Sequence, residues 1–215
     1  MRIKWLGHAS FLITSETGTK IINDPYTPGM GISYGEIRET ADIVTVSHGH
    51  GDHNNVAAVK GNPVVVKEIA PVEIKGIKFS GIPTYHDDAG GRQRGNNIIF
   101  CFEVDGIRIC HCGDLGHSLD NRQVDNLGKV DILLIPVGGG PTIGPDIATE
   151  VYHRLAPKVV IPMHYKTDKC GFPQWGADAF VKGKDGVNRL DNSEVEFKSG
   201  ELPDTTQIIV LEPAL

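Results

Sequence analysis

The sequence predicts a layered α/β sandwich, on three observations. Short runs rich in β-branched residues fill most of the first half of the 215-residue chain. Glycine, proline, asparagine and aspartate separate these runs, as expected for strands that end in turns. Helical patterns are fewer and lie mostly later in the chain. Many strands first, with helices interspersed and following, is an order typical of packed α and β layers rather than of a helical bundle or a pure barrel.

The expected strands are apolar runs bounded by turn residues. Asp105-Gly106 separates two of them and predicts a hairpin, because an Asp-Gly pair supplies the positive φ of a type I′ turn. In chain order, the expected strands are Ile3–Leu6, Phe11–Thr14, Lys20–Ile22, Ile43–Val46, Val64–Val66, Ile74–Phe79, Ile98–Val104, Ile107–Cys112, Ile132–Val137, Lys158–Ile161 and Gln207–Leu211.

The clearest helix is expected over Pro145–Leu155. Ile147, Val151 and Leu155 repeat every four residues, and the proline stands near the first helical position, where its missing N–H does no harm. Weaker patterns predict short helices at Arg122–Leu127, at Ala177–Val181 and after Asn54–Asn55.

Length and charge limit the classes of protein that need considering. A chain of 215 residues suits a single domain over 1–215. It carries 27 acidic and 21 basic residues, a formal net charge of −6. A general DNA-binding protein needs clustered Lys and Arg to neutralise phosphates, so we do not expect nucleic acid as a partner. A small-molecule substrate is expected instead, and the sequence leaves a homo-oligomer open.

The sequence predicts a cytoplasmic protein that does not enter the membrane. His8 interrupts the first apolar run, so the chain start has no apolar core of a signal peptide. No stretch approaches the roughly 18 apolar residues of a membrane span. The cysteines form no CxxC pair and are expected as buried free thiols in a reducing compartment; they are Cys101, Cys110, Cys112 and Cys170.

The segment 45–53, Thr-Val-Ser-His-Gly-His-Gly-Asp-His, carries the chemistry. Three imidazoles and one carboxylate fall within six residues directly after an apolar strand. A loop at a strand end can turn several such side chains inward, and divalent metals such as zinc bind neutral imidazole and carboxylate. The alternative is a polar loop that is histidine-rich by chance. With nine histidines in the whole chain, this spacing favours a metal site.

The segment resembles the H-x-H-x-D-H signature of the metallo-β-lactamase-fold hydrolases. The opening segment 5–11, Trp-Leu-Gly-His-Ala-Ser-Phe, and Asn23-Asp24-Pro25 resemble a branch that includes the ascorbate-6-phosphate lactonase-like proteins. The resemblance extends through nearly the whole chain. It implies an αββα sandwich of two mixed sheets flanked by helices, with a two-metal site along one edge.

The resemblance also implies the remaining ligands. His86 fits the third motif, Asp114 fits the bridging aspartate after a Gly-Asp step, and His164 fits the final histidine. One metal would then be held by His48, His50 and His86, and the other by Asp52, His53 and His164, with Asp114 between them. Zn²⁺ is expected, with Mn²⁺ as the alternative, because His50 stands where oxygen-reducing di-iron relatives usually have glutamate.

Two metal ions about 3.5–4 Å apart can share a hydroxide and stabilise an oxyanion, so no serine or cysteine nucleophile is required. We therefore expect a hydrolase that cleaves a phosphodiester, a lactone or an amide in a small polar substrate. The alternatives are a non-catalytic metal-bound sensing or scaffold protein and a metal-dependent nuclease. The expected catalytic residues are Asp52, Asp114 and His111.

Further polar residues stand near these ligands in the sequence. His8 and His111 are expected to hydrogen-bond a ligand or the substrate, with a buried structural histidine as the alternative. Asp24 is expected to order loops behind the site rather than to bind metal. Arg92 and Arg94, in the glycine-rich stretch after His86, are candidates for binding an anionic substrate group. Lys166 is a third candidate cation.

Overall fold

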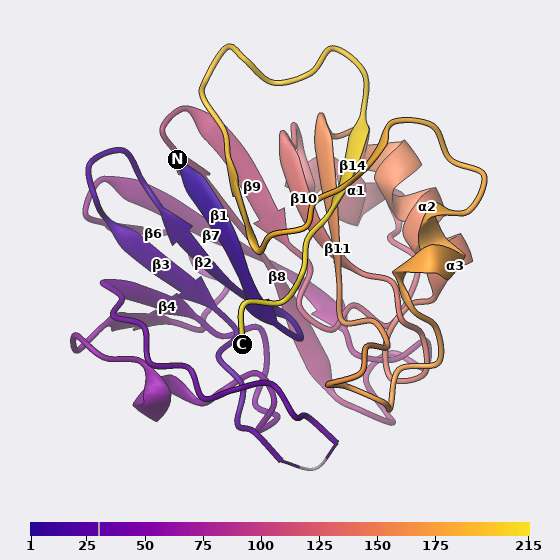
Figure 1. The fold of residues 1–215 in the computed structure, drawn as a ribbon, viewed down its shortest axis with the longest axis horizontal. Helices are drawn as coiled ribbons and strands as arrows, with labels where there is room; N and C mark the ends of the chain where they lie inside the picture. The colour runs from indigo at the N-terminus through magenta and orange to yellow at the C-terminus, as the bar shows by residue number, and fades with distance from the viewer. Residues whose placement is uncertain (30) are drawn as a thin grey trace.

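Two mixed β-sheets pack face to face and three α-helices cover one of them in the computed structural model, which describes residues 1–29 and 31–215 (Figure 1). The six-stranded sheet has the order β13-β1-β2-β3-β4-β5. Its strands are β1 (Arg2–Gly7), β2 (Ser10–Thr14), β3 (Lys20–Asn23), β4 (Ile43–Thr45), β5 (Val64–Val66) and β13 (Glu194–Glu196).

The eight-stranded sheet has the order β12-β14-β11-β10-β9-β8-β7-β6. Strands β9, β10, β11, β14 and β12 run parallel, and β10 is buried over its whole length, as expected where both faces of a parallel sheet are covered. The strands are β6 (Val72–Ile74), β7 (Ile77–Tyr85), β8 (Asn96–Val104), β9 (Ile107–His111), β10 (Ile132–Pro136), β11 (Val159–Met163), β12 (Val187–Arg189) and β14 (Gln207–Val210).

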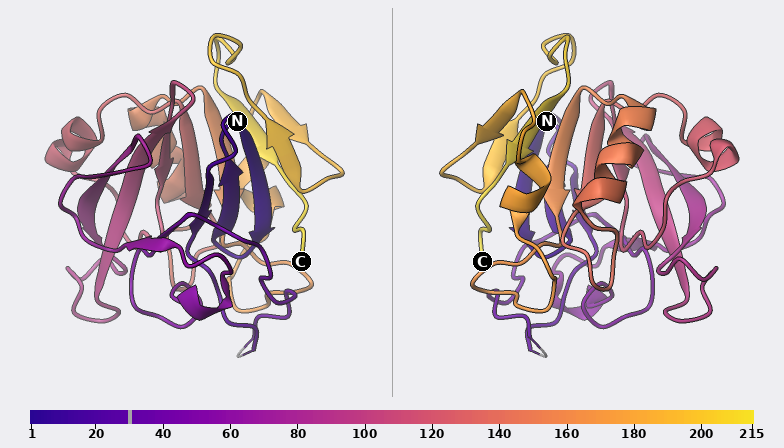
Figure 2. Two further views of the ribbon diagram at one scale, coloured as in Figure 1. Left: turned by 90° about the vertical axis from the view of Figure 1, so that its left-hand side faces the viewer. Right: turned by 90° about the vertical axis from the view of Figure 1, so that its right-hand side faces the viewer.

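The helices lie on the outer face of the eight-stranded sheet (Figure 2). Helix α2 (Pro145–Leu155) begins with a proline in its first turn, as expected, and buries Val151 and Leu155. The sequence also anticipated α1 (Asn121–Leu127), which begins with a capping box between Asp120 and Gln123, and α3 (Ala177–Val181). After Asn55 there is only a 3₁₀ turn, η1 (Val56–Ala58).

The hydrophobic core forms on both faces of the six-stranded sheet, because successive strand residues point to opposite sides. Ile21 and Ile43 belong to the large core between the sheets, whereas Ile22 and Val44 belong to a second cluster on the outer face. The second cluster also contains Tyr26, Ile32, Tyr34 and Ile37, from the loop between β3 and β4. The expected sandwich of two mixed sheets is confirmed, and irregular chain covers this outer face.

Two expectations about local structure are wrong. The run Ile74–Phe79 was expected as one strand, but Lys75 and Gly76 adopt φ of 51° and 77° and turn the chain back between β6 and β7. Cys101 and Cys110 form a disulfide, because β8 and β9 place them opposite each other with Cα atoms 4.3 Å apart. The prediction of free buried thiols is therefore correct only for Cys112 and Cys170, and the inference of a reducing compartment loses its support.

Within the described part of the chain, no helix is long and apolar enough to cross a membrane.

Candidate metal centre

Strand direction brings the candidate residues to one edge of the sandwich. In the eight-stranded sheet, β8 is antiparallel to both β7 and β9, and β11 is parallel to β10 and β9. Strands β7, β9 and β11 therefore run the same way, and His86, Asp114 and His164 follow their carboxyl ends. In the other sheet β1, β3 and β4 share a direction, and His8, Asp24 and the segment 47–53 follow them.

Three of these residues have left-handed backbone conformations. The φ angles are 54° at His8, 40° at Asp24 and 49° at His164, in a region that non-glycine residues adopt in only a few per cent of cases. The carbonyl oxygen of His8 accepts a hydrogen bond from the backbone N–H of His164 at 3.1 Å, which ties the two turns together. Backbone strain of this kind concentrates at functional sites and persists where the surrounding structure holds it.

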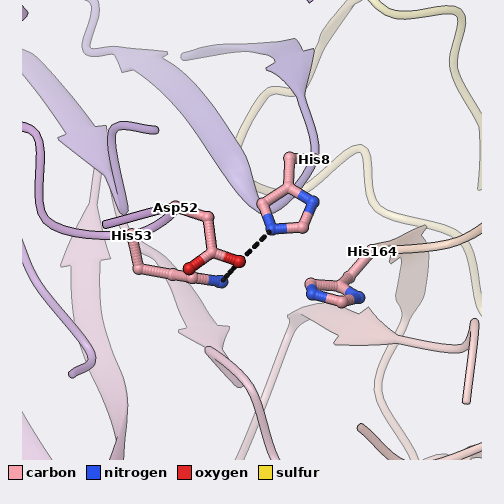
Figure 3. A group of neighbouring side chains, drawn as sticks. All are labelled: His8, Asp52, His53 and His164. Atoms are coloured by element: carbon pink, nitrogen blue, oxygen red, sulfur yellow. Dashed lines mark ion pairs between the residues drawn. The ribbon is translucent and has the colours of Figure 1, made fainter. Parts of the chain in front are cut away.

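The imidazole and carboxylate side chains form three groups of candidate metal donors, of which two share no residue. The remaining group, Asp24, His48 and His53, overlaps both its neighbours in space and includes the carboxylate that lies behind His53. Within each group, one donor atom from every residue lies within 4.8 Å of the others. The first group contains His48, His50 and His86; the second contains His8, Asp52, His53 and His164 and is drawn in Figure 3. His48, His50 and His86 thus fall in one group, and Asp52, His53 and His164 fall in the other together with His8.

Asp114 lies between the two groups, and each of its carboxylate oxygens faces a different one. Oδ1 is 3.1 Å from Nε2 of His53 and 3.4 Å from Nε2 of His164. Oδ2 is 3.2 Å from Nε2 of His86 and 3.9 Å from Nε2 of His48. A carboxylate in this position can bind two cations at once, one through each oxygen.

Asp24 orients the ring of His53 from behind. Its carboxylate is fully buried and lies 2.9 Å from Nδ1 of His53. It also accepts hydrogen bonds from the backbone N–H of Ser47 at 2.7 Å and from the Ser47 hydroxyl. A carboxylate at Nδ1 holds the ring in a fixed orientation and directs Nε2 toward Asp114.

Asn97 fixes the backbone that carries Asp114. Its amide group donates to the hydroxyl of Thr84 at 2.8 Å and to the carbonyl of Cys112 at 2.9 Å. Its Oδ1 accepts from the N–H of Asp114 at 2.9 Å. The sequence analysis gave Asn97 no role, although its place at the start of a strand directly across from the strand of His86 indicates a residue near the site.

Burial and neighbouring charges set the protonation state of each donor. At His53 burial lowers the pKa, but Asp114 and Asp24 together raise it well above the usual value, so this ring would release a proton on binding metal. Burial lowers the pKa of His48 and of His8 to about 3, so both rings are neutral. Although burial opposes ionisation of Asp114, His164 and His53 hold the pKa of its carboxyl well below the usual value. Neutral imidazoles and an ionised carboxylate are the forms that coordinate divalent cations.

Unpaired buried atoms in this cluster fit a bound metal. Among residues 1–29 and 31–215, the buried side-chain nitrogen and oxygen atoms that lack a hydrogen-bond partner all belong to the cluster, except Oδ1 of Asn23. They are Nε2 of His8, Nε2 of His53, Nδ1 of His86, Oδ1 of Asp114 and both ring nitrogens of His164. Leaving so many polar atoms unpaired is costly, and coordination of a cation would satisfy one nitrogen of each ring and Oδ1 of Asp114.

A pocket of about 850 Å³ opens beside the first group. His48 and His50 line it together with the apolar side chains of Val56, Val65 and Ile98, and Lys67 and Arg94 supply positive charge. The sequence analysis did not identify Lys67. A parallel arrangement of the strands at Ile43–Thr45 and Val64–Val66 would have indicated it. Because β5 runs parallel to β4, Lys67 after β5 reaches the same sheet edge as the segment after β4.

The loop after His86 is organised around one carboxylate. Asp87 accepts hydrogen bonds from the backbone N–H groups of Ala89, Gly91, Gln93 and Arg94 at 2.7–3.0 Å. Although burial acts in the opposite direction, these four donors lower its pKa to about 2. The loop therefore has a defined path that brings Arg94 to the pocket wall.

The structure does not bring the other candidate residues to the donors. Arg92 is exposed and is not among the residues that line this pocket. Lys166 lines a separate pocket of about 430 Å³. His111 is completely buried behind the cluster: its Nε2 lies 2.8 Å from the carbonyl of Ala9, and its Nδ1 accepts from the N–H of Gly113.

Comparison with known proteins agrees with this geometry. The β-lactamase superfamily domain matches residues 2–164. A UPF0173 metal-dependent hydrolase from Pelotomaculum thermopropionicum is 35% identical over 196 residues, which cover 78% of this chain and 85% of the relative. A UPF0173 metal-dependent hydrolase from Thermus thermophilus is 33% identical over 193 residues, which cover 78% and 84%.

The fold also matches a solved structure over nearly its whole length. A Thermotoga maritima protein assigned to the zinc-dependent hydrolases of the metallo-β-lactamase superfamily is 40% identical, covers 98% of both chains and superposes with a TM-score of 0.81. Two mixed sheets with a histidine and aspartate cluster at one edge thus define a metallo-β-lactamase-fold metal-dependent hydrolase. The chain belongs to the β-lactamase superfamily and is similar along most of its length to the UPF0173 metal-dependent hydrolases.

Proposed function

We propose that the protein hydrolyses a small polar substrate at a dinuclear metal centre. The first ion would be bound by His48, His50 and His86, the second by Asp52, His53 and His164, and Asp114 would bind both. One observation carries the proposal: the two carboxylate oxygens of Asp114 face different donor groups, at 3.1–3.4 Å from His53 and His164 and at 3.2 Å from His86.

Zinc is the metal that we propose, with manganese as the alternative. The donors are imidazoles and carboxylates, which suit both ions. The similar Thermotoga maritima protein, at 40% identity, is assigned to zinc-dependent hydrolases. Divalent ions held here would lower the pKa of water and stabilise negative charge that develops on the substrate.

The chain's own residues hold this arrangement in place. Asp24 keeps the Nδ1 proton of His53 and thereby directs Nε2 toward Asp114. Asn97 holds the backbone of Asp114. Buried, well-oriented donors need no rearrangement when charge develops during the reaction, which is how preorganised sites lower a barrier.

We assign substrate binding to the pocket beside His48 and His50. A volume of about 850 Å³ lies in the range of roughly 300–1,000 Å³ that is typical of small-molecule sites. Its wall combines apolar residues with Lys67 and Arg94, so it suits a substrate that has an apolar part and a negatively charged group. A phosphodiester, a lactone or an amide of that kind is the expected substrate.

An activity screen tests the proposal. Protein reconstituted with Zn²⁺ or Mn²⁺ is assayed against phosphodiesters, lactones, amides and oligonucleotides, with Asp114→Asn as the matched control. We expect hydrolysis of a small substrate that falls by at least a hundredfold in the variant. Cleavage of oligonucleotides alone would indicate a nuclease instead, and the absence of any hydrolysis by fully loaded protein would favour a binding or scaffold role.

A further inference from the structure

His8 lies inside the second donor group rather than beside it. The residue follows β1 and is only 1% exposed. Its Nε2 is 3.3 Å from Oδ2 of Asp52, and its ring centroid is 4.2 Å from that of His164 and 5.0 Å from that of His53 (Figure 3). The four side chains come from three separate strand ends and converge on one point.

Most of His8 is held by partners, but its Nε2 atom is not. The backbone carbonyl accepts from the indole N–H of Trp5 at 3.0 Å and from the N–H of His164 at 3.1 Å. Nδ1 lies 3.9 Å from the sulfur of Cys170, which is within hydrogen-bond range for sulfur. Nε2 has no hydrogen-bond partner among the described residues, because its approach to Asp52 is close but not aligned as a hydrogen bond.

The unpaired Nε2 of His8 lies beside other ring nitrogens that also lack hydrogen-bond partners. The Nε2 atoms of His53 and His164 belong to the same group and lack partners within residues 1–29 and 31–215 as well. Three buried imidazole nitrogens that converge without hydrogen bonds leave a polar void that costs folding energy. The backbone of His8 is moreover kept at φ 54°, a strain that merely filling space would not require.

We propose that His8 is a fifth side-chain ligand of the second metal ion, beside Asp52, His53, His164 and the shared Asp114, an inference that rests on the proposed dinuclear centre. One donor atom from each of the four residues lies within 4.8 Å of the others. Zinc bonds of about 2.0–2.2 Å bring ligand atoms within about 4.4 Å of one another. The donor atoms are therefore already grouped closely, and the side chains would move inward to share one ion.

The competing role for His8 is to donate a hydrogen bond to Asp52 and so position it. Two variants separate these roles. His8→Gln retains an N–H that can reach toward Asp52 but removes the imidazole nitrogen. His8→Gly removes both and suits the left-handed backbone. Phe172→Leu is the matched control, because its ring packs 5.6 Å from those of His8 and His164 but offers no donor atom.

The first test measures the affinity of each zinc ion by chelator competition, together with the visible spectrum of cobalt-substituted protein. We expect both His8 variants to bind the second ion at least a hundredfold more weakly than the wild type and to change the cobalt spectrum. The affinity of Phe172→Leu for this ion should stay within threefold of the wild type. If His8→Gln matches the wild type in affinity and spectrum, His8 positions Asp52 and the proposal is wrong. If the wild type binds only one ion, the proposed dinuclear centre is wrong. His8 is then still a ligand only if its variants bind that single ion more weakly.

The second test needs no variant and so does not depend on how well the variants fold. In a crystal structure of zinc-loaded wild-type protein, with the metals located by anomalous scattering, Nε2 of His8 is expected at about 2.0–2.1 Å from the ion. A separation greater than 3 Å from every ion would overturn the proposal.

Discussion

At the residue scale, the carboxylate of Asp24 connects the ring of His53 to the turn at Ser47. The spacing His-x-His-x-Asp-His and its resemblance to a known signature identified the donors, because metal ligands must be specific residue types close together. Asp24 was expected to order loops behind the site, and its hydrogen bond from Ser47 confirms this; its contact with the ring of His53 was not predicted. A buried carboxylate 29 residues away from its histidine is brought there by strand pairing, which spacing does not reveal.

Asn97 gives a stability prediction at the same scale. Asn97→Ala removes both a donor and an acceptor from buried backbone groups of Cys112 and Asp114. Leaving such groups unpaired costs about 1–3 kcal/mol each, so the free energy of unfolding should fall by roughly 2–6 kcal/mol. Urea denaturation of the metal-free wild type and variant measures this loss of stability.

The neighbouring Asn96 is the control for this prediction. Its side chain is exposed, so Asn96→Ala should change the free energy of unfolding by about 0.5 kcal/mol or less. Equal losses in the two variants would show that Asn97 does not hold the site as described.

At the element scale, the loop between β7 and β8 gives a prediction about kinetics. Arg94 lines the pocket beside His48 and His50, whereas Arg92 is exposed and outside it. Arg94→Ala should lower kcat/KM for an anionic substrate about tenfold, roughly 1.4 kcal/mol, because a guanidinium binds carboxylate or phosphate oxygens through two N–H groups. Steady-state kinetics on the substrate found by the activity screen measures this loss.

Arg92→Ala is the matched control, with kcat/KM expected within twofold of the wild type and metal content unchanged in both variants. The original expectation treated the two arginines alike. If they prove equivalent in kinetics, the pocket wall does not select the substrate, and the loop is only a connection between strands.

Most of the strands that the sequence predicted are buried apolar runs, although β5 exposes Val64 and Val65. The strands that the sequence did not predict form only because a neighbouring strand pairs with them. Strands β12 and β13 are short and largely polar, and they form because β14 and β1 offer them a partner. The β6–β7 hairpin turns at Lys75-Gly76, a weaker turn signal than the Asp-Gly pair between β8 and β9. Apolar periodicity records burial but not pairing.

At the scale of the whole molecule, the metal centre joins the two sheets. His48 and His53 follow a strand of the six-stranded sheet, whereas His86, Asp114 and His164 follow strands of the eight-stranded sheet. Metal that binds only the folded state stabilises it by about 2.7 kcal/mol when its concentration is a hundred times Kd. Chelation should therefore lower Tm by roughly 5–10 °C for a chain of this size.

Calorimetry with and without a chelator measures this shift, and re-addition of zinc should restore Tm. An unchanged Tm in protein shown by elemental analysis to have lost its metal would mean that the centre does not link the sheets energetically. The pairing of Cys101 with Cys110 could have been predicted, because the expected two-residue turn at Asp105-Gly106 sets these two residues opposite each other.

The central claim is that Asp114 joins two metal ions. Elemental analysis of fully reconstituted protein, side by side with Asp114→Asn, tests it most directly. The variant keeps the shape of the side chain but removes the charge that holds two cations together. We expect close to two divalent ions per wild-type chain and no more than one in the variant, with the fold of both confirmed by circular dichroism. At most one ion in the wild type, or two in Asp114→Asn, would contradict the account.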